Sequence, residues 1–320
     1  MTDSSRQSGS SYQASLFLRL LAGIEKLNPA ERKKTAEFIR SAGCADGGFR
    51  GRSTEVVTRS DLYYTGFALR SLLLLDSMDE TSVLQPAKSY IDGHSESFST
   101  PAELFSYTFC LSLLNQFGDV NGFVRRRTRL LECWSRYRRA DGCYASSENT
   151  TYSSTYMTFL AAGAFELLDA GMELAAIDPE PLLHRQGPDG GFVELEPLKR
   201  SGTNPTAAAV ALLKMRGVEP LNRSGVIDFL LTRQTSQGGF QANTQIDVAD
   251  LLSSFTALVA LADLEAEDRC DRETLRRFVK NLRSPDGGYR GAAWDRECDV
   301  EYTFYGLALE SLLAQIEPRV

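Results

Sequence analysis

The sequence predicts an all-α protein built from six similar repeats, closed into a ring of six inner and six outer helices. Two observations lead to this prediction. A glycine turn recurs along the chain, and each turn separates an amphipathic stretch from a more apolar one. A unit of this kind cannot bury its apolar face alone, so neighbouring copies must pack against one another.

The turns set the length of the repeat. Clear copies begin at Asp46, Asp141, Asp189, Gln237 and Asp286, and each carries glycine and then an aromatic residue. From Asp141 onward the copies are about 48 residues apart, and the first interval is about twice that length. A degenerate copy is therefore expected midway, where Asp92-Gly93-His94 stands. Glycine permits the tight turn that ends each preceding helix.

The elements follow in order along one domain, residues 14–320, behind a polar tail at 1–13 that we expect to be disordered. Two helices are expected at 14–26 and 29–41, the second with Asn28 as N-cap and Pro29 in its first turn. Later amphipathic helices are expected at 82–91, 121–138, 178–185, 222–233 and 271–283. The apolar helices that follow the turns are expected at 61–75, 103–117, 152–169, 204–216, 248–263 and 299–315.

The apolar helices are predicted to form the inner ring, because a helix that is apolar on most sides is buried on most sides. They would all point the same way, so their N-termini would gather at one mouth of a central cavity. Acidic residues stand at these starts, namely Asp61, Glu103, Asp250, Asp299 and Glu301. Each is a good N-cap or first-turn residue. The alternative is an acidic ring at the mouth that binds a cation or an amine.

Aromatic residues on the apolar helices are candidates to line the cavity. They include Tyr63, Tyr64, Phe67, Tyr107, Tyr156, Phe255, Tyr302 and Tyr305. In a ring of apolar helices some side chains must face the axis, where they would contact an isoprenoid chain and stabilise cations. The alternative is that they are ordinary core residues.

Composition narrows the function classes. The net charge of −7 argues against general nucleic-acid binding. No apolar run is long enough to span a membrane, and the N-terminus lacks the apolar core of a signal peptide. The six cysteines show no CxxC pair, which indicates reduced thiols and a cytoplasmic location.

The repeats resemble those of the prenyltransferase and squalene-cyclase family, whose members form an α/α toroid. The segments that carry the resemblance are HRQGPDGGFVELE (184–196), TRQTSQGGFQAN (232–243) and SPDGGYRGAAWD (284–295), each followed by its apolar helix. The resemblance covers the chain after residue 13. The six-copy count is most like the β chain of protein prenyltransferases, particularly the Rab geranylgeranyl type. It implies an isoprenoid ligand and a helical partner subunit.

The residues that serve the family's chemistry are largely replaced. The resemblance implies zinc held by an Asp, a Cys and a His, and the matching positions are Asp250, Leu252 and Tyr302. One carboxylate does not hold zinc tightly, so no zinc cofactor is expected. The segment 241–246, where the family places diphosphate-binding cations, contains none.

The hypothesis of a terpene cyclase also lacks a key residue. Class II cyclases protonate an alkene with the middle acid of a DxDD motif. The matching segment here is Asp247-Val248-Ala249-Asp250, in which Ala249 occupies the position of the proton donor. Asp247 and Asp250 remain the candidate catalytic residues.

Three hypotheses therefore stay open. The favoured one is a toroid that holds an isoprenoid or a partner in its cavity without zinc-dependent protein prenylation. The alternatives are a prenyltransferase that works without zinc and a terpene cyclase-like enzyme, both acting on a prenyl diphosphate. The arginine-rich stretch at 125–139 is interpreted as a solvated outer face, or else as a docking face for an acidic partner.

Overall fold

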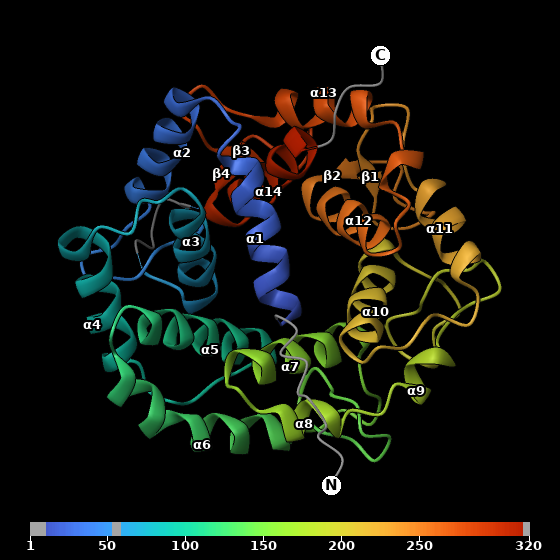
Figure 1. Cartoon of the computed structure of the whole chain (residues 1–320), viewed down its shortest axis with the longest axis horizontal. Coiled ribbons are helices and arrows are strands. Elements are labelled where there is room, and N and C mark those ends of the chain that lie inside the picture. The colour runs from blue at the N-terminus through green and yellow to red at the C-terminus, as the bar shows by residue number, and fades with distance from the viewer. Residues whose placement is uncertain (1–10, 53–58, 316–320) are drawn as a thin grey trace, which may run out of the picture.

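The computed structural model describes residues 11–52 and 59–315, and it shows a closed ring of helices (Figure 1). Each inner helix contacts the next in chain order, and the last contacts the first. The predicted all-α toroid is therefore confirmed. Residues 1–10 of the tail expected to be disordered at 1–13 lie outside the described residues. The expectation is wrong for the rest of the tail, because Ser11 caps a helix that begins at Tyr12. The inner helices are α3 (Leu62–Leu74), α5 (Pro101–Gln116), α7 (Thr155–Leu167), α10 (Thr203–Met215), α12 (Leu251–Asp263) and α14 (Val300–Gln315).

The outer layer is less regular than the inner one. The helix predicted at 178–185 is observed as the shorter α9 (Glu180–Leu183). Pro179 and Pro181 fix its start, and the turn follows at Gln186. The outer elements are α2 (Pro29–Ser41), the π-helical η1 (Glu80–Leu84) continuing into α4 (Gln85–Gly93), α6 (Val120–Arg136), α8 (Gly171–Ala175), α9 (Glu180–Leu183), α11 (Arg223–Leu231), the 3₁₀ turn η2 (Glu267–Arg269) and α13 (Arg272–Leu282).

Two short hairpins precede the last two inner helices. β1 (Phe240–Gln241) pairs antiparallel with β2 (Ala249–Asp250), and β3 (Tyr289–Arg290) pairs with β4 (Cys298–Asp299). In register, Phe240 faces Asp250 and Tyr289 faces Asp299. Each hairpin therefore fixes the start of an inner helix relative to its glycine turn.

A buried hydroxyl repeats in the inner helices and explains why the turn carries an aromatic residue. The backbone N–H of Phe49 donates to Thr65 Oγ1 at 2.8 Å, and that of Phe192 donates to Thr206 Oγ1 at 2.8 Å. The same bond joins Tyr144 to Thr158, Phe240 to Ser254 and Tyr289 to Thr303. The aromatic ring is buried while its backbone donor stays satisfied.

The turn glycines also join one repeat to the next. Gly190, Gly238 and Gly287 have φ near +90°, which favours glycine. A Cβ on Gly287 would stand 2.5 Å from the backbone of Lys34 on α2, and one on Gly238 would stand 2.2 Å from the backbone of Thr274 on α13. The turn of the last repeat thus packs on the first outer helix, which closes the outer ring.

α1 (Tyr12–Ile24) is not part of either ring but crosses one end of the barrel (Figure 1). Its first backbone N–H groups donate to Glu166 at the end of α7, and the Tyr12 hydroxyl donates to Asp263 at the end of α12. Ser311 and Gln315 of α14 donate to its carbonyl groups. The helix predicted at 14–26 therefore covers the C-terminal ends of the inner helices.

Candidate functional site

The mouth, at the N-terminal ends of the inner helices, holds a buried ion-pair cluster. Arg52 donates through Nε to Asp299 at 2.7 Å and through Nη1 to Asp295 at 3.2 Å. Asp299 also accepts from the backbone N–H of Tyr302, so it caps α14. Although burial opposes it, bonds to the two carboxylates hold the pKa of Arg52 above its ordinary value. The cluster joins the first repeat to the last.

Asp250 is an N-cap in the structure. Its carboxylate accepts from the backbone N–H and the hydroxyl of Ser253, at 2.7 and 2.8 Å. Burial raises the pKa of Asp250, and the bonds from Ser253 oppose that rise. Asp247 lies on the exposed loop before β2, so the structure does not pair these two candidates through a hydrogen bond.

The three positions that match the family's zinc ligands are neighbours at the mouth. Leu252 follows Asp250 in the first turn of α12. Tyr302 is near enough for the charge of Asp250 to contribute to the raised pKa of its phenol, behind burial and the charge of Glu301. Arg52 stacks over the Tyr302 ring at 5.3 Å. Tyr64 also lies at the mouth, within range of the charges of Asp299 and Glu301.

Glu301 does not cap its helix, unlike Asp250 and Asp299, and its carboxylate binds another inner helix. Its Oε1 accepts from the hydroxyl of Tyr63 at 2.7 Å, across the α14–α3 contact. Burial raises the pKa of Glu301 to about 7, and the charge of Asp299 acts in the same direction. A carboxyl group of this kind is partly protonated near neutral pH and can donate a hydrogen bond or a proton.

Aromatic rings from three inner helices form a continuous cluster behind Glu301. The Phe67 ring on α3 lies 5.4 Å from Tyr305 on α14, and Phe255 on α12 lies 5.6 Å from Tyr305. Phe304 contacts both Phe67 and Phe255. α3 and α12 are separated in the ring by α14, so these rings meet on its inner side. We call this region, inside the ring of inner helices, the lumen.

Tyr156 on α7 also faces the lumen. Burial raises its pKa to about 12, and the charges of Arg70 and Glu301 act on it as well. In the order of the inner helices, α7 and α14 stand opposite one another. The electrostatic interaction between Tyr156 and Glu301 therefore acts across the centre of the ring.

Tyr107 does not line the lumen, contrary to the sequence-based prediction. Its ring is fully buried at 0% exposure and packs on His94 and Phe98, beside the outer helix α4. The reason is that both faces of α5 are buried, so an aromatic residue there can serve either layer.

Arg70 on α3 is the most unusual lumen residue, and sequence reasoning missed it. It is the single charged residue between Asp61 and Asp76, which is the signal that marks it. The Arg70 guanidinium lies over the rings of Phe67, Phe105 and Phe109, at 5.2, 5.1 and 4.2 Å. Sequence reasoning also missed Arg52 and Asp295, because only the closed ring brings them together.

Glu194 is a further acid that the sequence did not single out. It accepts a hydrogen bond from the hydroxyl of Ser154, the N-cap of α7, and burial raises its pKa. The backbone N–H of Thr155 donates to the Glu194 carbonyl at 2.9 Å. Glu194 thus joins the fourth repeat to the third at the mouth.

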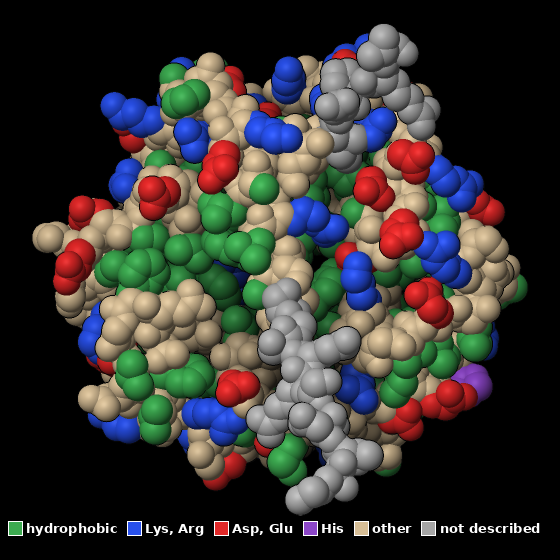
Figure 2. Space-filling model, in the orientation of Figure 1, with side chains coloured by type: hydrophobic (Ala, Val, Ile, Leu, Met, Phe, Trp, Pro, Cys, Tyr) green, Lys and Arg blue, Asp and Glu red, His purple; other side chains and the backbone are tan. Residues whose placement is uncertain are grey.

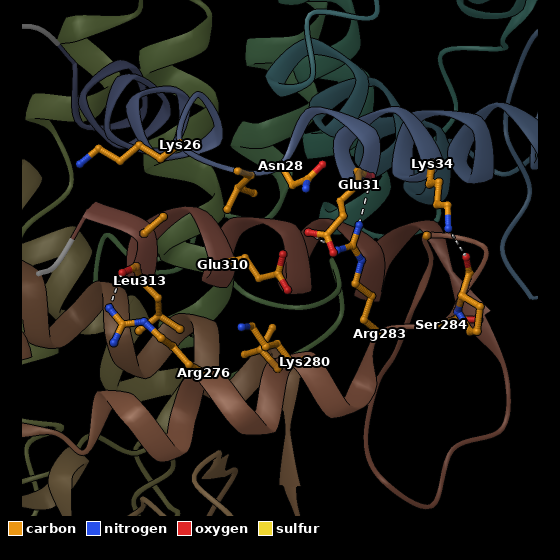
Figure 3. A pocket seen from close by; sticks show the side chains of 15 residues that line it. Lys26, Asn28, Glu31, Lys34, Arg276, Lys280, Arg283, Ser284, Glu310 and Leu313 are labelled. Carbon is orange, nitrogen blue, oxygen red and sulfur yellow. Dashed lines mark hydrogen bonds and ion pairs between the residues drawn. The ribbon is translucent and has the colours of Figure 1, made fainter. Parts of the chain in front are cut away.

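A groove of about 650 Å³ lies outside the ring, where α2 meets α13 and α14 (Figure 3). Arg283 pairs with Glu31 at 2.8 Å, and Arg276 donates to the Leu313 carbonyl at 2.7 Å. None of the residues predicted to line the cavity borders this groove. It follows the seam between the first and last repeats and is separate from the lumen.

Several arginines of the 125–139 stretch are used inside the molecule. Arg126 pairs with Asp92 and Glu96, and Arg127 donates to the Leu168 carbonyl. Arg139 donates to the carbonyl groups of Ser147 and Thr150. Arg126 and Arg127 thus bind neighbouring repeats together, and Arg139 binds the loop that follows its own helix. The other arginines of the stretch are exposed, as predicted for a solvated face, namely Arg125, Arg129, Arg136 and Arg138.

Three further findings bear on the site. In the described part of the chain, no group of three or more His, Cys, Asp or Glu side chains is placed to hold a metal ion. Among the same residues, no helix is both long and apolar enough to cross a bilayer. All six cysteines are free thiols.

Several solved structures share this architecture. The type II terpene cyclase MstE from Scytonema superposes with a TM-score of 0.58 at 11% identity, over 92% of this chain and 98% of that one. Protein geranylgeranyltransferase-I from Candida albicans gives 0.52 at 16% identity, over 98% and 86%. A D-mannose isomerase gives 0.64 at 13% identity, over 88% and 96%. At these identities the likeness shows the fold alone.

The sequence comparisons agree with the repeats. No curated protein matches the chain. The profile of the prenyltransferase alpha-alpha toroid domain matches residues 1–241 and 206–319. Because these matches span nearly the whole chain, the protein belongs to the prenyltransferase alpha-alpha toroid domain family.

Proposed function

We propose that this toroid binds an isoprenoid chain in its lumen and does not carry out zinc-dependent protein prenylation. The observation that carries the proposal is the aromatic cluster formed by Phe67, Phe255, Phe304 and Tyr305 on the inner side of the ring. Ring faces and edges offer a branched hydrocarbon a large apolar contact area.

The structural neighbours support this ligand class by analogy. MstE has been solved with geranylgeranyl dihydroxybenzoate as substrate, and the Candida transferase with GGPP. Leu252 and Tyr302, which replace the expected zinc Cys and His, favour binding without metal-dependent thiol chemistry.

Calorimetric titration with geranylgeraniol and geranylgeranyl diphosphate tests the proposal. We expect saturable binding at one site, weakened about tenfold by Phe255→Ala. Phe278→Ala is the matched control, because Phe278 packs on Gly239 between an outer helix and a turn. The absence of binding by both ligands, or equal effects of the two variants, would contradict the proposal.

A terpene cyclase-like reaction is the second candidate, and Glu301 favours it. Its carboxyl group adjoins the aromatic cluster and holds a proton near neutral pH. Arg70 opposes it, because a fixed positive charge in the lumen destabilises a carbocation. Incubation with squalene or geranylgeranyl diphosphate, followed by mass spectrometry of the extract, separates the candidates. Protonation by Glu301 followed by proton loss isomerises the substrate, so the expected product is a cyclic isomer of squalene or a cyclic diphosphate. Such a product that disappears in Glu301→Gln would establish the cyclase.

A further inference from the structure

Arg70 is a half-buried cation without a counter-ion. Within the described residues it forms no ion pair and no hydrogen bond, and its Nη2 is shielded from solvent. By contrast, Arg185, which is buried, pairs with Asp141 and bonds to Ser153 and Thr155. Arginine is rarely buried unless it is paired, because removing the charge from water is costly. Arg70 is therefore an exception that calls for an acceptor.

The three phenylalanine rings compensate the charge only in part. Stacking on Phe67, Phe105 and Phe109 gives a cation–π attraction that offsets only part of the cost of removing the charge from water. A guanidinium has five N–H donors, and a ring face accepts them weakly. Burial lowers the pKa of Arg70, in keeping with an uncompensated charge. The rings fix the position of the guanidinium and leave its donors available.

Two phenols share the same space. Tyr156 on α7 and Tyr305 on α14 both act electrostatically with Arg70, although they belong to different inner helices. Neither hydroxyl makes a hydrogen bond within the described chain, whereas that of Tyr63 binds Glu301. Several charges act on these two phenols, and Arg70 is the positive one that acts on both.

We propose that Arg70, with Tyr156 and Tyr305, binds the carboxylate of a lipid-chain acid whose hydrocarbon part lies along the aromatic cluster. The proposal rests on the lumen-binding function given above. A single guanidinium matches a singly charged head group, whereas a diphosphate calls for several cations. The phenols complete the recognition as neutral donors.

The position of Arg70 sets the direction of the ligand. It lies four residues from the end of α3, or about 6 Å along the helix axis. This is the end that α1 crosses, and Figure 2 shows a recess lined by hydrophobic side chains there, beside α1 and over α3 and α5. The head group would lie beneath α1, with the chain directed toward Glu301 and the mouth.

Matched probes test this assignment. Geranylgeranoic acid and geranylgeraniol share one chain and differ in the charge of the head. Wild-type protein should bind the acid at least tenfold more tightly at pH 7.5. Arg70→Met should abolish that preference and leave the affinity for the alcohol within about twofold. Arg129→Met, on the exposed face of α6, should change neither affinity.

The outcomes separate this inference from the proposed function. Binding of the alcohol with no preference for the acid, or a preference that survives Arg70→Met, overturns the Arg70 site and leaves lumen binding standing. Tighter binding of geranylgeranyl diphosphate than of the acid also overturns it. Failure of the acid, the alcohol and the diphosphate to bind overturns both proposals.

The nature of the chain is a separate arm of the same experiment. Palmitate carries the same head group on an unbranched chain. Equal affinity for palmitate and geranylgeranoic acid supports a general lipid-acid site, and a tenfold preference for the branched acid supports an isoprenoid acid. Tyr156→Phe should reduce the preference for acid over alcohol in either case, because one neutral donor is lost.

Discussion

Arg52 and Arg70 lie toward opposite ends of the same ring, and their charges have different surroundings. Arg52, at the mouth, binds two carboxylates from the last repeat. Arg70, near α1, lies against three aromatic rings and has no acceptor among the described residues. The first arrangement is complete without a ligand, and the second is not. The difference separates charges that close the ring from a charge that is left for a ligand.

The mouth cluster should give the largest effect on stability. Asp299→Ala removes a carboxylate that is 3% exposed and leaves Arg52 with one partner, and it also removes the cap of α14. We expect the free energy of unfolding to fall by about 3 kcal/mol, measured by urea denaturation. Asp228→Ala, which breaks the exposed pair with Arg269, should cost less than about 1 kcal/mol. Equal losses would show that the cluster does not hold the ring closed.

Glu301, between the mouth and the lumen, should make the free energy of unfolding depend on pH. The folded protein holds this proton more tightly than the unfolded chain, so its contribution is complete below the unfolded pKa near 4.5 and is lost as pH rises to about 7. We expect a loss of about 2 kcal/mol over that range. Tyr63, Asp299, Arg52 and Tyr156 act electrostatically with Glu301, and so do Tyr64, Tyr302 and Tyr305.

Glu301→Gln checks the assignment of that slope. The amide keeps the shape of the protonated acid and cannot ionise, so its unfolding free energy should be flatter between pH 5 and pH 8. At pH 8 the variant should be the more stable protein. Parallel curves for the wild type and the variant would assign the slope to other groups.

Replacing each of the two arginines by methionine should change the stability of the fold in opposite directions. Without ligand, Arg70→Met replaces a half-buried unpaired charge by an apolar side chain, so we expect stabilisation of about 1 kcal/mol. Arg52→Met leaves two buried carboxylates unpaired and should destabilise by about 2 kcal/mol. Thermal melts of both variants provide the measurement. If Arg70→Met loses as much as Arg52→Met, the distinction between the two ends fails.

The loop before α12 should give the smallest effect. Asp247 is exposed, so Asp247→Ala should change the unfolding free energy by less than about 0.5 kcal/mol and leave ligand affinity unchanged. Asp250→Ala removes a helix cap and should cost about 1 kcal/mol. If Asp247→Ala lost lipid binding, Asp247 would have to be counted among the residues of the functional site.

Much of the architecture could be predicted from local chemistry. The glycine turns gave the repeat length, and the apolar stretches gave the inner helices near their observed bounds. The strand pairs were missed, because two-residue strands such as Phe240–Gln241 leave no periodic signal. At the site, the family resemblance implied that Leu252 and Tyr302 lie near Asp250. In the structure Leu252 is in the helical turn that Asp250 caps, and the charge of Asp250 acts on Tyr302.

The sequence by itself determined the repeat, the closed order of the inner helices and their low content of charged residues. Only the tertiary structure decided that α1 covers one end, that Arg52 meets Asp295 and Asp299, and that Tyr107 faces outward while Arg70 is left in the lumen. The physical reason is that an inner helix is buried on all sides. Its hydrophobic pattern then carries little information about which face meets the axis and which meets the outer layer.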